Sequence, residues 1–212
     1  MNKDNIEVSK ATLNRLPLYL KYLYQLDKMG VKTVSSTLIA GGLNLNPVQV
    51  RKDIAVASSV AGKPKTGYVT KELIVDLESF LGYDNTHDAV LVGVGGLGSA
   101  FLGYKGFEHY GLNIAAAFDV NPQIVGSEVN GKLVQHIDEL EGVVKRYKIR
   151  LGIITVPSKA AQEVADVMVK AGIKAIWNFA PVHLNIPSDI EIKTEDLAAN
   201  LALLSMKINN ID

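Results

Sequence analysis

A glycine-rich turn is the part of this sequence whose residue types and spacing are best suited to ligand binding. Gly93, Gly95 and Gly98 have the spacing Gly-x-Gly-x-x-Gly, after an apolar segment rich in β-branched residues and before a helical pattern. In such a unit the first glycine permits a tight turn, the second lets a pyrophosphate approach the backbone, and the third lets the helix lie close to the sheet. The unpaired N–H groups of the helix N-terminus also favour phosphate. The pattern predicts a dinucleotide site at Gly93, Val94, Gly95, Gly96, Leu97 and Gly98.

An acidic residue follows this turn at the distance that a dinucleotide site requires. Asp119 ends the next apolar run and lies 21 residues after Gly98. Its carboxylate would accept hydrogen bonds from the adenosine ribose, and its charge would repel a 2′-phosphate. No arginine follows in residues 120–122. The pair of features favours NAD(H) over NADP(H), and it disfavours the alternative of a glycine-rich turn that binds nothing.

A second candidate site, for DNA, lies in the first 86 residues. Asn46-Pro47 predicts the start of a helix, because Asn is a good N-cap and Pro fits the first helical position. Gln49, Arg51 and Lys52 then lie on its first turns, and a short helix that Gly41-Gly42 is expected to end precedes it. Two helices joined by a short turn, the second of them basic, are typical of a helix-turn-helix.

The loop at 61–68 adds to the positive charge of this region. It contains two glycines, one proline and the lysines Lys63 and Lys65, which predicts a β-hairpin wing against a phosphate backbone. Residues 1–86 carry 11 Lys and Arg against 8 Asp and Glu, whereas residues 87–212 carry 11 against 14. This asymmetry indicates a polyanionic partner. A solvated basic face is the alternative.

The elements that position these residues follow from hydrophobic periodicity. In the first part we expect a helix that Ser9 caps, that Pro17 interrupts and that stops at Met29-Gly30, and another helix from Thr70. In the second part strands are expected at 89–93, 113–119, 132–135, 150–155, 174–178 and near 190–193, and helices at 97–110, 137–147 and 158–171. This alternation is typical of a parallel sheet with helices on both faces.

The composition narrows the classes of protein further. There is no cysteine, so disulfides, thiolate metal sites and redox thiols are excluded. No apolar run resembles a membrane span, and the polar N-terminus lacks a signal-peptide core, so we expect a cytoplasmic protein that binds no membrane. The final segment forms an unusually apolar helix. We expect it to pack on a second subunit, with folding back onto its own sheet as the alternative.

Many short motifs in this chain resemble, in the same order, those of the Rex family of bacterial redox-sensing transcriptional repressors. The motifs are Arg15-Leu16-Pro17-Leu18-Tyr19, Val34-Ser35-Ser36, Val50-Arg51-Lys52-Asp53, Gly62-Lys63 through Gly67-Tyr68, Gly93 to Gly98, Ala117-Phe118-Asp119, Thr155-Val156-Pro157, Ala171-Gly172-Ile173-Lys174, Asn178-Phe179-Ala180-Pro181-Val182 and Asp196-Leu197-Ala198. The resemblance implies an α/β protein: a winged helix-turn-helix domain at 1–84, a Rossmann domain with a doubly wound parallel sheet at 85–194, and a C-terminal helix at 195–212 that is exchanged between the subunits of a homodimer. Such a protein binds a pseudo-palindromic operator in double-stranded DNA when NADH is scarce, and releases it when NADH binds.

The resemblance also implies roles for individual residues. Besides the glycine turn and Asp119, it implies cofactor contacts for NADH or NAD+ from Thr155, Val156, Pro157, Asn178, Phe179, Ala180 and Pro181. DNA contacts are expected from Ser35, Ser36, Asn46, Gln49, Arg51, Lys52, Lys63 and Lys65, while Asp53 is expected to orient a neighbouring Arg or Lys. The switch residues are Arg15, Tyr104, Asp196 and Leu197. In the family the Tyr104 and Asp196 positions pair across the dimer when NADH is bound, and the Arg15 position pairs with that Asp in the other state.

Three other functions are compatible with these patterns. The second domain could bind another adenine nucleotide or CoA and regulate DNA binding by that signal. An NAD-dependent oxidoreductase would need a general acid or base, for which His183 is the best candidate, but a hydrogen-bonded loop histidine is more common, so we expect no enzyme activity. The N-terminal domain could also make only protein contacts.

Overall fold

The computed structural model describes residues 8–58, 62, 67–83 and 87–208. The chain divides into two compact units, Met1–Asn85 and Thr86–Asp212. Each unit has its own hydrophobic core, and each is described by itself.

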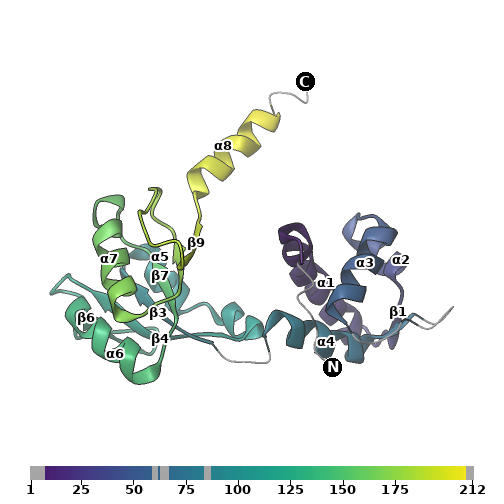
Figure 1. Ribbon diagram of the computed structural model, residues 1–212, viewed down its shortest axis with the longest axis horizontal. Coiled ribbons are helices and arrows are strands. Elements are labelled where there is room, and N and C mark those ends of the chain that lie inside the picture. The colour runs from purple at the N-terminus through teal and green to yellow at the C-terminus, as the bar shows by residue number, and fades with distance from the viewer. Residues whose placement is uncertain (1–7, 59–61, 63–66, 84–86, 209–212) are drawn as a thin grey trace. The chain divides into compact units, whose positions relative to one another are not determined.

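In the described part of unit 1, four helices pack against one another and a two-stranded ribbon lies at their edge (Figure 1). Its elements are α1 (Lys10–Lys28), β1 (Thr33–Val34), α2 (Ser36–Leu43), α3 (Pro47–Ala57), β2 (Tyr68–Val69) and α4 (Thr70–Leu81). The strands are antiparallel, with Val34 opposite Tyr68. The helices bury a core that includes Leu16, Leu20, Ile39, Ile54 and Leu73. A helical unit in which one strand before α2 pairs with one strand after α3 is the winged helix-turn-helix arrangement.

The expectation that Pro17 interrupts the first helix of unit 1 is wrong. Pro17 does not interrupt the first helix, since α1 continues through it to Lys28. The lost hydrogen bond to the carbonyl of Leu13 costs about 3 kcal/mol, and the burial of Leu16, Tyr19 and Leu20 on either side of the proline offsets that cost. The predicted cap by Ser9 is confirmed, because its side chain accepts a hydrogen bond from the N–H of Thr12.

The glycine pair of the second helix also has a different role from the one expected. Gly41-Gly42 lies inside α2, which ends at Leu43 with Asn44 in the left-handed conformation, at a φ of 53°. A Cβ on Gly42 would lie 2.2 Å from the ring of Tyr22 in α1. Gly42 therefore lies where α2 closely approaches the Tyr22 side chain of α1, and it does not end the helix.

Unit 2 contains a seven-stranded sheet with the order β5-β6-β4-β3-β7-β8-β9. The strands are β3 (His87–Val92), β4 (Leu112–Asp119), β5 (Glu128–Val129), β6 (Lys132–His136), β7 (Leu151–Ile154), β8 (Ala175–Asn178) and β9 (Glu191–Thr194). Within the described residues of this sheet, β5 and β6 pair antiparallel and every other neighbouring pair is parallel. The direction of winding reverses between β3 and β7, so the carboxyl ends of these two strands form the crevice where doubly wound sheets bind ligands.

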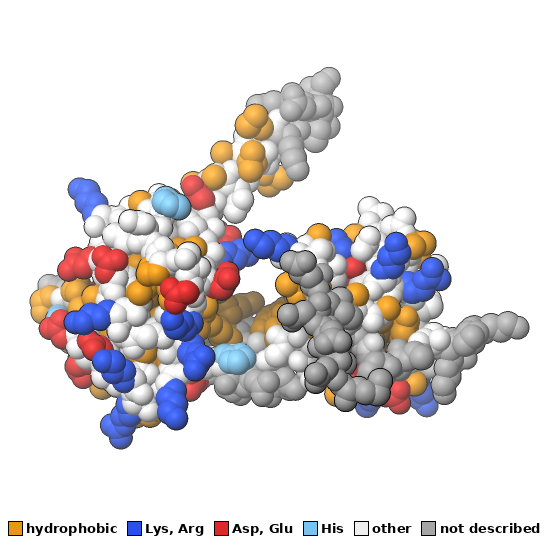
Figure 2. Space-filling view, in the orientation of Figure 1, with side chains coloured by type: hydrophobic (Ala, Val, Ile, Leu, Met, Phe, Trp, Pro, Cys, Tyr) orange, Lys and Arg blue, Asp and Glu red, His pale blue; other side chains and the backbone are white. Residues whose placement is uncertain are grey.

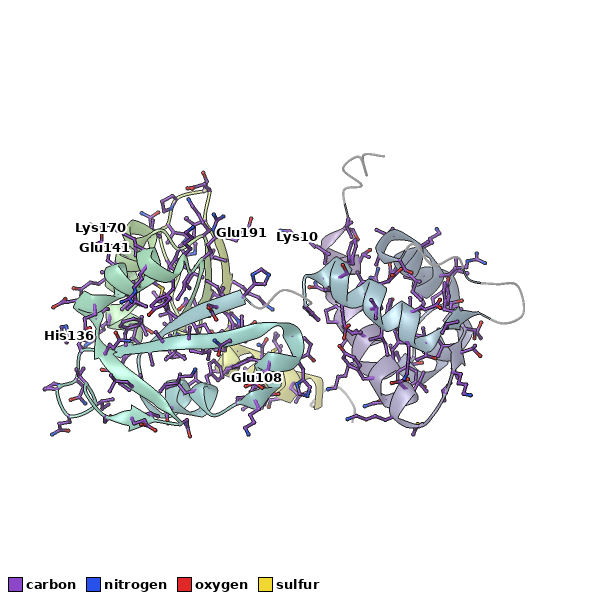
Figure 3. The ribbon with its side chains drawn as sticks, turned by 90° about the horizontal axis from the view of Figure 1, so that it is seen from below. Lys10, Glu108, His136, Glu141, Lys170 and Glu191 are labelled. Carbon is purple, nitrogen blue, oxygen red and sulfur yellow. The ribbon has the colours of Figure 1, made fainter. Side chains whose placement is uncertain are left out.

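Helices cover both faces of this sheet (Figure 1). α6 (Leu140–Tyr147) and α7 (Ser158–Ala171) pack on one face, and α5 (Gly96–Leu102) with the 3-10 turn η1 (Lys105–Tyr110) packs on the other. A short 3-10 turn, η2 (Ile137–Glu139), precedes α6. On the outside of the first face, Glu141 of α6 approaches Lys170 of α7 to 3.7 Å (Figure 3).

The helix expected as one piece at 97–110 is divided in two. α5 ends at Leu102, and the chain resumes as η1 after Gly103 and Tyr104. A Cβ on Gly106 would lie 2.4 Å from the ring of Tyr104, so the tyrosine occupies the space beside this second segment.

The last helix, α8 (Leu197–Ile208), leaves its apolar side chains uncovered (Figure 2). Leu197 is 60% exposed, Leu201 68% and Met206 63%, so α8 does not fold back onto its own sheet in this structure. Its exchange between two subunits stays a prediction. In the described part of the chain, no helix has the length and apolarity that a bilayer span needs.

Candidate functional site

The glycine turn lies at the carboxyl end of β3, in the crevice between β3 and β7. Gly93 has a φ of +100°, and a Cβ there would lie 2.7 Å from the Val156 side chain that follows β7. A Cβ on Gly98 would lie 2.0 Å from the carbonyl oxygen of Gly93. Both glycines are therefore required by the packing of the turn against the sheet and against α5.

Gly95 and Gly96 differ from these two glycines because nothing in the protein requires them to lack a side chain. A Cβ on either would have no atom within 4 Å. The helix α5 begins at Gly96, and no side chain caps its N-terminus. Open space and uncapped backbone at the same place are what a pyrophosphate needs if it is to approach the turn. The residues present thus fit a dinucleotide.

Asp119 sits beside this turn at the end of β4. Its Oδ2 accepts a hydrogen bond from the N–H of Val94 at 2.7 Å. Its Oδ1 accepts from the N–H groups of Val120 and Asn121, both at 2.8 Å. The carboxylate that was predicted to bind the ribose therefore also fixes the glycine turn, and its orientation is set before any ligand arrives.

Thr155 connects the two strands that border the crevice. Its hydroxyl donates to the carbonyl of Gly93 at 2.7 Å, and its backbone N–H donates to the carbonyl of Val92 at 3.0 Å. Val156 is half-buried and Pro157 is exposed. The segment 155–157 thus forms the β7 side of the crevice.

Asn178 lies at the end of β8, where its side chain holds the loop that follows. It is fully buried, and its Nδ2 donates to the carbonyls of Ala180 and Val182 at 3.0 and 3.2 Å. Its Oδ1 accepts from the N–H of Ala180 at 2.9 Å. The structure thus engages this amide within the protein, so a direct contact with the cofactor stays a prediction. Pro181 is exposed, whereas Ala180 is 1% exposed.

An aromatic cluster covers the sheet next to α5, and it joins the predicted site residues Phe179 and Tyr104 to Phe101, Phe107 and Trp177, which the sequence analysis did not identify. The ring of Phe179 lies 4.8 Å from Phe101 and 4.5 Å from Trp177, measured between centroids. Phe107 lies 5.6 Å from Phe101, and it also contacts the exposed ring of Tyr104 at 4.9 Å. The cluster combines two segments about 70 residues apart, 101–107 and 177–179, and no local pattern links them. The cluster makes the β8 side of the site apolar.

The predicted switch residues are not joined in this structure. Asp196 accepts a hydrogen bond from the N–H of Ala199 at 2.8 Å and so caps α8. Tyr104 and Leu197 are exposed. Among the described residues, no hydrogen bond connects Tyr104 to Asp196. The predicted pairing belongs to a dimer and stays a prediction.

In unit 1, side-chain caps position the predicted DNA-reading residues. Ser35 caps α2 by accepting from the N–H of Leu38, and Asn46 caps α3 by accepting from the N–H of Val48 at 2.8 Å. Arg51 and Lys52 are exposed on α3, and Ser36 is half-buried. The predicted phosphate contacts Lys63 and Lys65 lie outside the described residues.

The carboxylate of Asp53 is the centre of a hydrogen-bond network between α1 and α3. Asp53 is 2% exposed. Arg15 donates to both of its oxygens, from Nε to Oδ2 at 2.7 Å and from Nη2 to Oδ1 at 3.0 Å. Tyr19 donates to Oδ2 at 2.7 Å, while Thr12 and Gln49 donate to Oδ1 at 3.1 and 2.9 Å. The prediction that Asp53 orients an arginine or lysine fits this geometry, but the partner is on another helix, 38 residues away.

The network changes the titration of its members. Burial alone raises the pKa of Asp53, but the hydrogen bonds from Arg15, Tyr19, Gln49 and Thr12 outweigh burial and lower the pKa to about 2. Burial and the hydrogen bond to Asp53 raise the pKa of Tyr19 to about 12. The hydrogen bond to Asp53 raises the pKa of Arg15 above its ordinary value. The ion pair therefore persists at neutral pH.

This shift predicts an acid-dependent loss of stability. The folded pKa of Asp53, about 2, lies below the ordinary value of 3.8, so its contribution is complete above about pH 4 and is lost as the pH falls toward 2. We expect the wild-type protein to lose about 2 kcal/mol more unfolding free energy over this range than Asp53→Asn. Urea titrations followed by circular dichroism at each pH would measure the difference, because the other carboxylates contribute equally to both proteins. An identical pH dependence would contradict the assignment.

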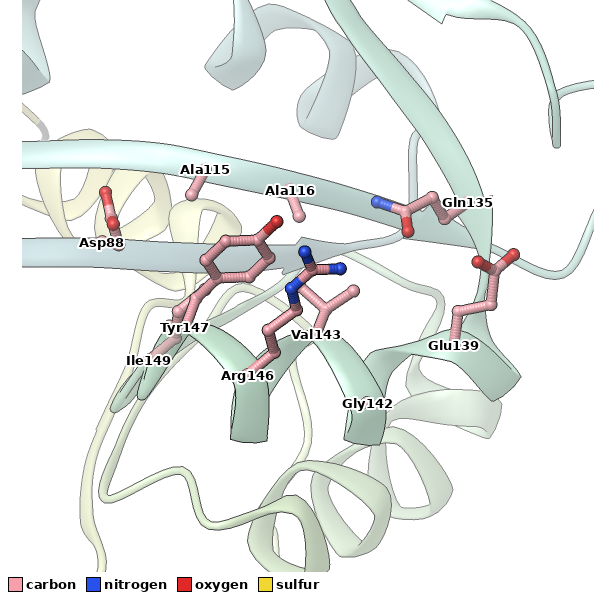
Figure 4. Close-up of a pocket in the computed structure, with 10 residues that line it drawn as sticks. All are labelled: Asp88, Ala115, Ala116, Gln135, Glu139, Gly142, Val143, Arg146, Tyr147 and Ile149. Atoms are coloured by element: carbon pink, nitrogen blue, oxygen red, sulfur yellow. The ribbon is translucent and has the colours of Figure 1, made fainter.

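A cavity of about 750 Å³ lies elsewhere in unit 2, between α6 and the sheet (Figure 4). The small residues Ala115, Ala116 and Gly142 leave the space open, and the side chains of Arg146 and Tyr147 project from α6 toward the strands. The predicted cofactor residues are all in the described part of the chain, and none of them lines this cavity. This cavity is therefore separate from the candidate dinucleotide site at the glycine turn.

Comparison with known proteins matches both units. A family model described as a putative DNA-binding protein N-terminus matches residues 7–55, and one described as a CoA binding domain matches residues 84–182. The chain is 41% identical over 208 residues to the redox-sensing transcriptional repressor Rex of Bacteroides fragilis, covering 98% of this chain and 94% of that protein. It is 43% identical over 209 residues to Rex of Treponema denticola, covering 99% of each.

Solved structures agree with these relatives. A crystal structure of the Rex-family repressor RSP with β-NAD+ and operator DNA has a TM-score of 0.91 to this chain at 35% identity, covering 97% of this chain and 94% of that one. The crystal structure of RSP with β-NADH has a TM-score of 0.85, also at 35% identity, covering 97% and 96%. The likeness thus extends over both units.

Proposed function

The chain belongs to the Rex family of redox-sensing transcriptional repressors, and from this premise we propose that it binds operator DNA when NADH is scarce and releases it when NADH binds. Unit 1 reads the DNA, and the crevice of unit 2 takes NADH or NAD+. The protein acts in the cytoplasm as a regulator and catalyses no reaction.

In this proposal the active form is a homodimer. Residues 1–84 form the DNA-binding domain, residues 85–194 the NAD(H)-binding domain, and residues 195–212 the helix that is exchanged between subunits. The uncovered apolar side chains of α8 support a partner that buries them. Two reading helices related by a twofold axis match a pseudo-palindromic operator.

The observation that carries the proposal is the open turn at the β3–β7 crevice. Gly95 and Gly96 leave room beside an uncapped helix start, and the carboxylate of Asp119 is held against the same turn. Room for a pyrophosphate next to an acid for the ribose favours NAD(H).

Preference for the reduced cofactor follows from charge. The nicotinamide ring is cationic in NAD+ and neutral in NADH, and burial of an unpaired cation among apolar groups such as Val156 and Phe179 is unfavourable. A ligand shifts an equilibrium only by its differential affinity for the two states. A shift from 1:99 to 99:1 needs about 5.5 kcal/mol, to which both sites of a dimer can contribute.

We expect NADH to bind at least about tenfold more tightly than NAD+, which corresponds to about 1.4 kcal/mol. Calorimetry would measure both affinities, and a mobility shift with genomic fragments would follow release of DNA on addition of NADH. Equal affinities for the two forms, or DNA occupancy that is unchanged at saturating NADH, would contradict the proposal.

A second candidate is regulation by CoA, because the family model that matches residues 84–182 describes a CoA-binding domain. Thermal-shift measurements with NADH, NAD+, CoA and ATP would separate the two. Stabilisation by CoA alone would favour this candidate. An assay of NADH turnover with simple ketones tests for catalysis, for which we expect no activity.

A further inference from the structure

The network around Asp53 connects a residue that reads DNA to a residue on another helix. Gln49 is exposed on the first turns of α3, and its Nε2 donates to Asp53 Oδ1. The same oxygen accepts a hydrogen bond from Nη2 of Arg15 in α1. Arg51 and Lys52 are also exposed on α3, but in the described structure neither has a hydrogen bond or ion pair to this carboxylate. Of the three predicted DNA-contacting residues on α3, Gln49 is thus the one whose side chain is held by a buried residue of unit 1.

The hydrogen bond to Asp53 leaves Gln49 able to contact a base. A glutamine amide has two N–H donors and one carbonyl acceptor. One donor is used by Asp53, so the second N–H and the carbonyl stay available. These two groups are what a glutamine needs for a bidentate contact with the N6 and N7 edge of adenine. The network therefore restrains the side chain without blocking the groups that recognise DNA.

The restraint depends on Arg15. This guanidinium supplies two of the five hydrogen bonds to Asp53, one on each oxygen, and the charge that offsets the buried carboxylate. Arg15 is itself 23% exposed, so it is accessible from outside the core. If the Arg15 side chain were displaced from Asp53, Oδ1 would keep only Thr12 and Gln49 as donors. The position of Arg15 thus affects the orientation of the Gln49 amide through the carboxylate that both side chains contact.

We propose that Asp53 is a positioning residue for DNA recognition, which orients the amide of Gln49 and couples it to Arg15. This inference rests on the proposed function, since it describes how the same repressor reads its operator. It predicts that a displacement of Arg15 changes the contact of Gln49 with the DNA as well as the packing of α1 on α3.

A double-mutant cycle on operator affinity tests the proposal. We expect Asp53→Asn to weaken binding about 3- to 10-fold, because an unrestrained glutamine side chain must be ordered when DNA binds. In a Gln49→Ala background the same change should have almost no further effect. Arg51→Ala is the matched control, since it removes an exposed residue of α3 outside the network. Its effect should add to that of Asp53→Asn.

Milder variants keep the test valid if Asp53→Asn is poorly folded. Thr12→Val removes one hydrogen bond from Oδ1, the oxygen that holds Gln49, whereas Tyr19→Phe removes one from Oδ2. Arg15→Lys keeps the charge but loses the two-point contact. We expect Thr12→Val and Arg15→Lys to couple to Gln49→Ala more strongly than Tyr19→Phe does. Thermal unfolding of each variant confirms that the DNA measurements are made on folded protein.

The outcomes separate this inference from the function on which it rests. If the wild-type protein binds no DNA fragment, both the positioning role of Asp53 and the repressor function are contradicted. If it binds DNA and the Asp53–Gln49 cycle is additive within error, the positioning role is overturned and the repressor function stands. Coupling to Arg51→Ala of the same size as coupling to Gln49→Ala would also overturn it, because the effect would then be a general disturbance of α3.

Discussion

Replacement of Gly95 by alanine is expected to weaken NADH binding about 10- to 100-fold with only a small loss of stability. A methyl group at this position meets no protein atom within 4 Å, so it would occupy the space that a pyrophosphate needs. Filling a space that a ligand should occupy costs about 1–3 kcal/mol, and each 1.4 kcal/mol is a factor of ten in affinity. The unfolding free energy should fall by about 1 kcal/mol or less, since Gly95 is the N-cap of α5, where alanine is less favourable than glycine, and its extended backbone is one that alanine also adopts. Calorimetry with NADH and thermal unfolding measure the two effects.

Gly98→Ala is the contrasting variant. Its methyl group would lie 2.0 Å from the carbonyl oxygen of Gly93, so the turn must move. We expect this protein to lose both NADH binding and stability in unit 2. If Gly95→Ala bound NADH with wild-type affinity, the pyrophosphate would not lie at this turn, and the assignment of the site would be wrong.

Asp119→Ala is expected to weaken NADH binding about 100-fold or more while DNA binding by the ligand-free protein is preserved. The variant loses the acceptor for the ribose, and hydrogen bonds to a charged group contribute about 1.5–3 kcal/mol each. The variant also loses the hydrogen bond that the N–H of Val94 donates to Asp119 Oδ2 at 2.7 Å. Unit 1 contains none of these atoms, so its reading helix should be unaffected. Mobility shifts over a range of NADH concentrations would show a repressor that stays on DNA where the wild type has left.

Asp119→Asn separates the charge from the shape of this side chain. It retains one carbonyl oxygen for the backbone N–H groups but has no negative charge, so we expect an affinity for NADH between those of wild type and Asp119→Ala. Loss of DNA binding by ligand-free Asp119→Ala would mean that the residue holds the whole protein together rather than a ligand.

Gly95→Ala and Asp119→Ala have a common consequence for regulation. Both weaken NADH binding in unit 2 and leave α3 in unit 1 intact, so each should raise the NADH concentration required for release of DNA. Variants of the Asp53 network change unit 1 and should alter operator affinity in the absence of any ligand. The two classes of variant thus distinguish effects on NADH binding from effects on DNA recognition.

Local patterns in the sequence were sufficient for several elements and caps, although not for the helix expected at 97–110. The helix expected at 158–171 is observed with those bounds, and the strand expected at 113–119 begins one residue earlier. The caps by Ser9 and Asn46 are also confirmed. Such features depend on neighbouring residues, through periodic burial, caps and turn-forming glycines, so they can be read along the chain.

The same local rules failed where distant residues decide the conformation. Pro17 continues in a helix because the core of unit 1 holds both sides of it, and Gly42 lies inside α2, where Tyr22 of α1 occupies the space beside it. The aromatic cluster likewise joins α5, η1 and β8. A proline or glycine has the same local preference in every sequence, and only packing determines whether that preference is obeyed.

Residue types and spacing were enough to predict a strand–turn–helix unit for a dinucleotide, with an acid at the end of the next strand, and a basic helix-turn-helix before it. The contacts of those residues became clear only from the folded chain. It placed Asp119 against Val94, turned the amide of Asn178 inward to the loop that follows β8, and joined Arg15 to Asp53 across 38 residues. The reason is physical: a spacing motif specifies backbone shape over a few residues, whereas the partner of a buried polar group is set by which helices and strands the hydrophobic core brings together.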